Sequence, residues 1–110
     1  MLRYRRLTAR ATRTDRDPLA ALPAKRLAFP SPDATFDLVR AGSLQCGDAA
    51  LVEVGDRVPA NGRVLAIADE DTRVTSADAV RPTTLRSCDA VTRGLRIERG
   101  WIVIEVTRDP

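Results

Sequence analysis

Few side chains of this 110-residue chain are placed to do chemistry. The densest group of acids is Asp69-Glu70-Asp71, whose carboxylate oxygens could attract a divalent cation, but the run lacks the spacing of an EF-hand loop. A solvated acidic turn is the favoured interpretation. The chain contains no histidine, so it lacks the usual general base near neutral pH and any Ser-His or Cys-His nucleophile pair. The sequence therefore argues against most hydrolases and favours a protein without catalytic activity.

The two cysteines, Cys46 and Cys88, lie far apart and match no metal-ligand spacing. Without histidine, a zinc site would have to consist of thiolates and carboxylates alone, so we expect no metal and no cofactor. Two reduced thiols are the favoured state of the cysteines, and a disulfide is the alternative.

Arginine supplies nearly all of the positive charge: the formal net charge is +3 and Lys25 is the only lysine. Recognition of phosphate or nucleic acid is one interpretation, because the guanidinium fork pairs with phosphate. A general compositional bias is the favoured one, because the net charge is modest and acids are interspersed. One Trp, one Tyr and two Phe provide no series of aromatic rings for stacking single-stranded nucleic acid.

Residues 1–22 are predicted to form a basic N-terminal arm, followed by one β domain at 23–110. Residues 1–14 contain five arginines and no acid, which fits a short basic helix, an irregular arm or a targeting peptide. Pro18 and Pro23 limit any helix after this segment to a turn or two. No apolar run approaches the roughly 20 residues that a membrane-spanning helix needs.

Short alternating runs separated by turn residues predict several strands. They are expected at 24–29, 35–39, 50–54, 63–67, 95–98 and 101–107, with the last two joined as a hairpin and with Val52 and Val54 on one face. Residues 72–90 show little periodicity and are expected to be mostly loop, with at most one short strand. Almost no helical period appears, so the chain is predicted to be an all-β sandwich or small barrel.

Two Gly-Asp pairs mark the turns that must position these strands. Glycine supplies the positive φ of a tight reversal, and aspartate can bond nearby backbone. The segment from 47 to 64 is therefore expected to be a compressed set of hairpins. Its turn formers, and one aromatic residue at the start of the last strand, are interpreted as scaffold rather than as ligands: Gly47, Asp48, Gly55, Asp56, Pro59, Gly62 and Trp101.

The order of these residues resembles the actuator domain of P-type cation ATPases. The matching pattern is L-x-x-G-D-x-x-L-V-E-x-G-D-x-V-P-A-x-G-x-V, which runs from Leu44 to Val64. The tail, Val91-Thr92-Arg93-Gly94-Leu95-Arg96-Ile97 followed by Trp101-Ile102-Val103-Ile104-Glu105-Val106, is similar to the end of that domain in the B subunit of Kdp-type potassium-transporting ATPases. Two weaker matches lie upstream, at 11–15 and 24–27.

The resemblance implies a distorted β jelly roll, a double-stranded β-sandwich, on the cytoplasmic side of a membrane. In that family a loop carrying Thr-Gly-Glu-Ser works on a phospho-aspartate of another domain, and its glutamate positions the attacking water. A carboxylate within hydrogen-bond reach of that water supplies both orientation and base.

This sequence departs from the family at the loop. The motif should fall near residues 74–84, where the chain reads Val-Thr-Ser-Ala-Asp-Ala-Val-Arg-Pro-Thr-Thr, without Thr-Gly-Glu. Asp78 and Glu70 are the nearest carboxylates, in the wrong context. Arg81 and Arg86 flank the altered stretch and are candidates for contacting phosphate or a partner's carboxylate. The phosphorylation motif and a nucleotide-binding region are also missing from these 110 residues.

Two functional hypotheses follow. The first is a degenerate actuator-like domain, stand-alone or a remnant, that is non-catalytic and binds a protein partner, such as ATPase subunits or domains, or a second copy of itself. The second is a small basic module that binds nucleic acid or an anionic surface through its N-terminal arginines.

Overall fold

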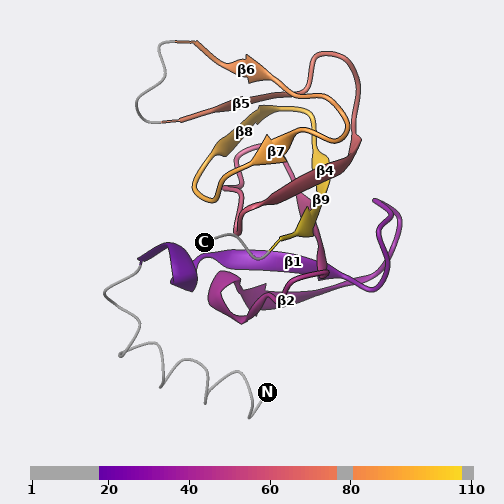
Figure 1. The fold of residues 1–110 in the computed structure, drawn as a ribbon, viewed down its shortest axis with the longest axis vertical. Coiled ribbons are helices and arrows are strands. Elements are labelled where there is room, and N and C mark those ends of the chain that lie inside the picture. Colours follow the sequence, from indigo (N-terminus) through magenta and orange to yellow (C-terminus); the bar gives the residue numbers. More distant parts are fainter. Residues whose placement is uncertain (1–17, 77–80, 108–110) are drawn as a thin grey trace.

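The computed structural model describes residues 18–76 and 81–107 of the chain (Figure 1). These residues form nine β-strands and two short 3₁₀ helices, η2 (Pro18–Ala21) and η3 (Ala41–Ser43), which confirms the all-β class. The strands are β1 (Pro23–Leu27), β2 (Phe36–Arg40), β3 (Ala49–Val52), β4 (Gly62–Ile67), β5 (Arg73–Thr75), β6 (Thr83–Thr84), β7 (Ala90–Val91), β8 (Arg96–Arg99) and β9 (Ile102–Val106). Within the two described ranges no helix has the length and apolar character to cross a bilayer. The predicted basic helix of residues 1–14 lies outside these ranges.

The strands make two antiparallel sheets. The larger has six strands in the order β2-β1-β3-β9-β4-β7, and the smaller has three in the order β6-β5-β8. The last strand, β9, lies in the interior of the larger sheet, with Leu51 and Val52 of β3 opposite Val103 and Ile102 on one side. On its other side β9 pairs with β4, where a register shift between Val64 and Ala66 marks an irregularity.

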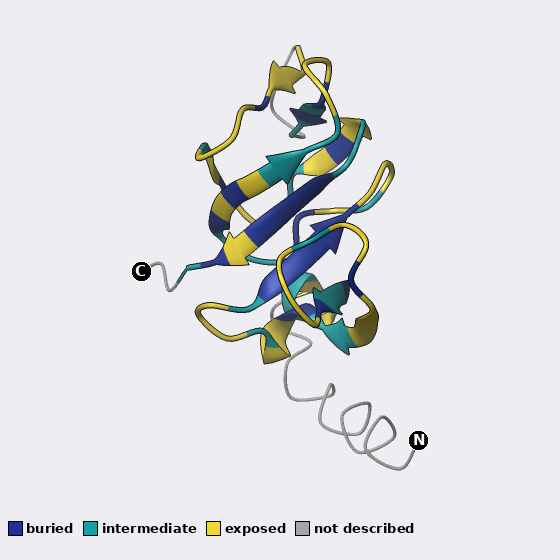
Figure 2. Ribbon diagram, turned by 90° about the vertical axis from the view of Figure 1, so that its right-hand side faces the viewer, coloured by how far each residue is buried: buried dark blue, intermediate teal, exposed yellow. Residues whose placement is uncertain are grey.

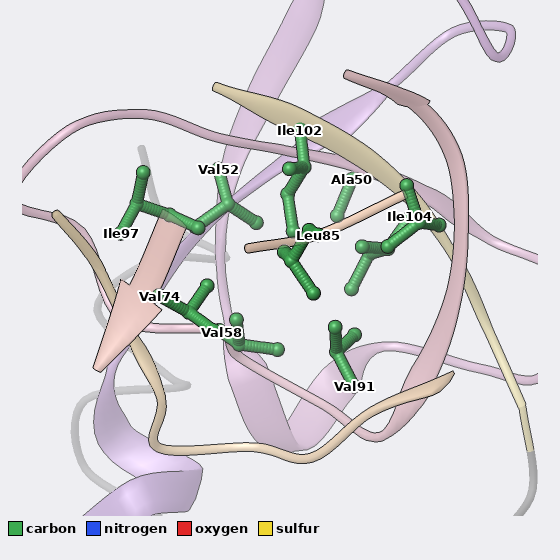
Figure 3. Packing of buried hydrophobic residues seen from close by; sticks show 10 residues of the cluster. Ala50, Val52, Val58, Val74, Leu85, Val91, Ile97, Ile102 and Ile104 are labelled. Atoms are coloured by element: carbon green, nitrogen blue, oxygen red, sulfur yellow. The ribbon is translucent and has the colours of Figure 1, made fainter. Parts of the chain in front are cut away.

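The main hydrophobic core lies between the two sheets. Figure 3 shows side chains from both sheets pointing toward one another, with Ile102 and Ile104 of β9 near Val58, Val91 and Leu85. The full cluster is Ala50, Val52, Val58, Val64, Val74, Leu85, Val91, Ile97, Ile102 and Ile104. Alternate residues of β9, Ile102 and Ile104, point into this core, as the two-residue period of a strand requires.

A second, smaller cluster covers the opposite face of the larger sheet. It contains Leu27, Ala34, Ala49, Leu51 and Val103, with Trp101 and Ala66 packed against it. Val103 is fully buried, so the centre of β9 is buried on both faces. This accounts for the run of apolar residues that begins this strand.

Both hairpin predictions are wrong. β3 and β4 do not pair with each other, because β9 lies between them. β8 and β9 belong to different sheets: Gly100, with a φ of 83°, lies between them at the point where the chain passes from the smaller sheet to the larger. The strand positions follow from local pattern, whereas the choice of partner depends on residues far away in sequence.

Two further expectations need correction. Residues 72–90 contain β5, β6 and the first residue of β7, and each of these strands is only two or three residues long, which is too short to produce a visible alternation. Val54 does not continue β3 on the face of Val52: the strand ends at Val52, and Val54 is 59% exposed in the following turn.

Candidate functional site

The segment in which the resemblance would place the working loop is the β5–β6 hairpin. Arg73 lies opposite Thr84 and Val74 opposite Thr83, so residues 76–82 connect two antiparallel strands of the smaller sheet. Figure 1 shows this hairpin at one end of the molecule, and both residues of β6 are exposed (Figure 2). Asp78 lies outside the described residues.

Arg81 and Arg86 are both exposed, and they fall on opposite sides of β6. Arg81 precedes β6 at the end of the hairpin connection. Arg86 follows β6 and begins a turn in which its N–H donates to Asp89 Oδ2 at 2.8 Å. The chain therefore places the two arginines at the two ends of one short strand, and no contact joins them among the described residues. Their proposed role in contacting a partner stays a prediction.

The two Gly-Asp pairs build turns of one design. In the first turn, the N–H of Asp48 donates to the Gln45 carbonyl at 2.9 Å, and the N–H of Gln45 donates back to Asp48 Oδ2 at 2.8 Å. Gly47 has a φ of 94°, the positive value that the third position of a type II turn requires. These residues therefore act within their own turn, as a scaffold would.

The second turn repeats the same bonds. The N–H of Asp56 donates to the Glu53 carbonyl at 2.8 Å, the N–H of Glu53 donates to Asp56 Oδ2 at 3.1 Å, and Gly55 has a φ of 87°. The N–H of Gly55 also donates to the Ile97 carbonyl at 2.9 Å. This last bond ties the turn to β8 of the smaller sheet.

A third turn of this design was not predicted from the sequence. The N–H of Asp89 donates to the Arg86 carbonyl at 3.2 Å, which matches the backbone bond of the other two turns. Cys88 occupies the glycine position with a φ of 74°, and it is the one non-glycine residue with positive φ in the described parts of the chain. Cys46 and Cys88 are both free and exposed, as the composition favoured.

The remaining scaffold residues are buried or half-buried. Pro59 is buried and Trp101 half-buried against the smaller core cluster. A Cβ on Gly62 would lie 2.5 Å from the Glu105 carbonyl oxygen, so β4 and β9 approach more closely than any side chain at this position allows. Gly62 therefore serves the contact between two strands rather than a turn.

Lys25 links the second Gly-Asp turn to the larger sheet. Its ammonium group forms ion pairs with Glu53 Oε1 and, at 3.2 Å, with Asp56 Oδ2, and it lies 5.8 Å from the centre of the Phe36 ring. The hydrogen bond to Glu53 is the main cause that raises the pKa of Lys25, and the bond to Asp56 adds to it. Burial of the lysine opposes this shift.

The acidic stretch 69–71 forms a turn of its own. The N–H of Asp71 donates to Asp69 Oδ1 at 2.8 Å, and the N–H of Asp69 donates to the buried hydroxyl of Thr72 at 3.2 Å. Asp71 also lies 3.8 Å from the guanidinium of Arg99. Across residues 18–76 and 81–107 no three or more metal-ligating side chains converge.

Sequence reasoning missed one cluster altogether. Arg57 lies opposite Arg96 at an isolated bridge, and Arg96 lies opposite Thr75 in the pairing of β5 with β8. These three side chains therefore stand in one row on one face. With Ser76 and Gly94 they line a hollow of about 250 Å³ beside the end of β5, where the connection to β6 begins. Arg57 and Arg96 come from distant parts of the sequence, so no local pattern could have indicated the row.

Comparison with known proteins shows that the chain is similar in sequence and fold to parts of cation-transporting ATPases. No family model matches it. The potassium-transporting ATPase ATP-binding subunit of Serratia proteamaculans is 34% identical over 90 residues, which are 79% of this chain and 13% of that protein. The subunit of the same name from Yersinia enterocolitica is 36% identical over the same length. The chain thus spans 13% of the length of the curated relatives that it matches.

Solved structures agree with this similarity. A zinc-transporting PIB-type ATPase with a TM-score of 0.61 is 27% identical, over 84% of this chain and 15% of its own. A second structure of a zinc-transporting PIB-type ATPase, in a different state, gives the same TM-score with 25% identity over 93% of this chain and 16% of its own. Sequence and fold together confirm the resemblance to the actuator-like domain of P-type ATPases.

Proposed function

We propose, on the premise of this resemblance to an actuator-like domain, that the chain is a non-catalytic module that binds a protein partner. One observation carries the proposal: the strand and turn framework of the domain is present, while residues 74–84 contain no Thr-Gly-Glu. The retained framework supports a role that depends on shape. The partner we infer is a subunit or domain of a P-type ATPase, on the cytoplasmic side of a membrane.

The chemistry supports the absence of hydrolytic activity. Hydrolysis of an acyl phosphate needs a carboxylate within hydrogen-bond reach of the attacking water, on a segment that can approach the phosphoryl group. The hairpin connection of this chain contains Arg81 and Pro82, and the stretch 74–84 contains neither a glycine nor a glutamate. A proline restricts the backbone, and an arginine cannot accept a proton from water.

Turnover of acetyl phosphate tests this part of the proposal. We expect release of inorganic phosphate in the presence of the purified chain to equal the rate in buffer. Asp78→Asn is the informative variant, because Asp78 is the carboxylate nearest in sequence to the lost motif. Turnover that the chain accelerates and that this substitution removes would overturn the non-catalytic assignment.

Partner binding is tested separately. The fluorescently labelled chain is titrated with a purified potassium-transporting ATPase ATP-binding subunit, and the anisotropy is measured. We expect saturable binding that an excess of unlabelled chain reverses. The matched control is the unlabelled Ile104→Ala variant, in which the core is damaged and competition should weaken. A flat titration, together with a monomeric chain in analytical ultracentrifugation, would contradict the partner-binding role.

The second candidate, a basic module for nucleic acid or an anionic surface, rests on the five arginines of residues 1–14. Binding through phosphate contacts weakens steeply as salt rises, because counterions are released. A gel shift at low and moderate salt therefore discriminates the two candidates. A shift at low salt that disappears at moderate salt favours the second, and no shift at either leaves the first.

A further inference from the structure

We propose that the row Arg57–Arg96–Thr75 is a binding site for a small oxyanion, namely a phosphoryl group. This site goes beyond the proposed function, because it requires neither a partner nor the absence of hydrolytic activity. The row lies on the face of the smaller sheet that points away from the core, since Val74 and Ile97 of the same strands are buried. Its residues line the hollow beside the end of β5, where the connection to β6 begins.

Backbone hydrogen bonds hold the row in place. The N–H of Val58 donates to the Leu95 carbonyl at 2.6 Å, and the N–H of Ile97 donates to the Asp56 carbonyl at 2.9 Å. These bonds lie on either side of the bridge between Arg57 and Arg96. The ion pairs of Lys25 with Glu53 and Asp56 fix the turn that precedes Arg57. Two guanidinium groups are therefore presented side by side by backbone that is itself fixed.

The charge of this pair is not compensated. Like charges directly opposite on neighbouring strands destabilise a sheet. Three other arginines on strands lie near acids: Arg26 lies 3.6 Å from Asp37, Arg99 lies 3.8 Å from Asp71, and Arg63 lies opposite Glu105. Within residues 18–76 and 81–107, neither Arg57 nor Arg96 has an ion-pair partner, and Glu98 does not line the hollow. An external anion would supply the missing charge.

Further positive charge lies along the same two strands. Arg73 and Arg99 lie opposite each other in β5 and β8, beyond a register shift between Arg73 and Val74. Arg73 Nε is buried and has no hydrogen-bond partner among the described residues. Four arginines thus lie on or beside the paired strands β5 and β8, against two acids, Asp71 near Arg99 and Glu98 within β8. This surplus of charge attracts anions to the hollow over a distance of about one Debye length, roughly 8–10 Å.

The size and lining of the hollow indicate the class of ligand. Its volume of about 250 Å³ lies below the roughly 300–1,000 Å³ of sites for drug-sized molecules, so the occupant is a small group rather than a nucleotide. Guanidinium groups bind phosphate in bidentate fashion, and the hydroxyls of Thr75 and Ser76 can donate to further oxygens. A tetrahedral oxyanion satisfies both kinds of donor, which a flat carboxylate does less completely.

Inorganic phosphate is the first probe. Amide NMR spectra of the ¹⁵N-labelled chain are recorded during titration with sodium phosphate at constant ionic strength, with sodium chloride as the reference. We expect saturable shifts at Thr75, Ser76 and Arg96, with a dissociation constant in the millimolar range. Arg57→Gln and Arg96→Gln should each weaken binding about tenfold, the effect of losing one charge-assisted hydrogen bond. Arg63→Gln removes an exposed arginine elsewhere and should leave binding unchanged.

Thermal unfolding provides an independent readout. An anion that binds only the folded state raises the midpoint of unfolding. Phosphate should therefore raise the midpoint of the wild type and of Arg63→Gln, but not of Arg57→Gln. Without phosphate, Arg57→Gln should be at least as stable as the wild type, because repulsion from Arg96 is relieved. Absence of saturable shifts in the wild type, or equal weakening by Arg63→Gln, would overturn the site.

A second probe distinguishes the source of the phosphoryl group. A short phosphoserine peptide and its unphosphorylated form are titrated alongside inorganic phosphate. Tighter binding of the phosphopeptide than of inorganic phosphate assigns the site to a protein-borne phosphoryl group, and equal binding assigns it to the free anion. All of these are equilibrium measurements without turnover. Their failure is therefore distinct from a positive acetyl phosphate assay or a flat partner titration.

Discussion

The two sheets of this molecule carry very different constraints. In β9, the interior strand of the larger sheet, four of five residues are buried, whereas both residues of β6 in the smaller sheet are exposed (Figure 2). The larger sheet holds most of the strands in the segments that resemble the actuator domain, whereas the β5–β6 hairpin of the smaller sheet includes residues 74–84, which contain no Thr-Gly-Glu. The contrast shows that burial is concentrated in the interior strand of the larger sheet, and that the exposed strand β6 of the hairpin contributes little to it.

The largest expected difference comes from truncating one side chain in each sheet. Ile104→Ala in β9 removes a fully buried side chain from the main core and should lower the free energy of unfolding by about 2–5 kcal/mol. Thr84→Ala in exposed β6 should change it by no more than about 0.5 kcal/mol. Urea denaturation followed by circular dichroism measures both. Equal losses of unfolding free energy in the two variants would contradict the proposed difference in constraint between the two sheets.

Gly62→Ala tests the close approach of two strands in the larger sheet. The added Cβ would lie 2.5 Å from the Glu105 carbonyl oxygen, so β4 or β9 must shift, at a cost of about 1–3 kcal/mol of unfolding free energy. Arg63→Ala, at the next and exposed position of β4, is the control and should have a small effect. A Gly62→Ala variant with wild-type stability would show that β4 and β9 can separate enough to hold the added methyl group at no cost in unfolding free energy.

Cys88→Gly probes the connection between the sheets and should stabilise the protein. A non-glycine residue at positive φ costs about 1–2 kcal/mol, and the greater freedom of glycine in the unfolded chain returns about 0.4–1 kcal/mol of that. We therefore expect a net gain of about 0.5–1 kcal/mol in unfolding free energy. Cys46→Gly is the matched control, because Cys46 precedes Gly47 in the equivalent turn without a positive φ, and it should lose stability. A loss in both variants would contradict the strain at Cys88.

The smallest expected effect concerns Lys25, through which the larger sheet contacts the second Gly-Asp turn. Its pKa is raised in the folded state, chiefly by the hydrogen bond to Glu53, so the protonated form stabilises folding. This contribution is fully present below the unfolded value of about 10.4 and is lost as pH rises through the higher folded value. The stability difference between wild type and Lys25→Met should be constant from about pH 7 to 9 and shrink above about pH 10.5.

The magnitude of this effect is about 1 kcal/mol or less, because both carboxylates are substantially exposed. Urea denaturation of both variants at several pH values isolates it, since alkaline effects shared by the two proteins cancel in the difference. A difference that grows above about pH 10.5 would show that the ammonium group opposes folding.

The sequence predicted most strands of the larger sheet to within one or two residues, because alternation is a local signal. The expected strand at 63–67 is β4, and the one at 101–107 contains β9. Partner choice was not predictable from the same signal: the interior position of β9 depends on burial of Val103 against Leu51 and Leu27, which are far away in sequence.

In the smaller sheet, β8 matches the strand expected at 95–98, but β5 and β6 were not located from the sequence, for a different reason. Strands of two or three residues contain no period, and Arg57 and Arg96 become neighbours only through a single bridge. The Gly-Asp turns were predicted from residue type, whereas the third turn carries cysteine where glycine is expected and so gave no signal.

The interior position of β9 has a consequence for synthesis on the ribosome. β3 and β4 are made long before residues 102–106, and until those residues emerge each presents an unpaired edge. In the nascent chain the edges of β3 and β4 therefore stay unpaired until β9 is made. β9 then inserts between the two strands and forms hydrogen bonds with both. Chaperone contact during this interval, and sensitivity of the yield to the rate of translation through the codons for residues 102–106, are the expected signs.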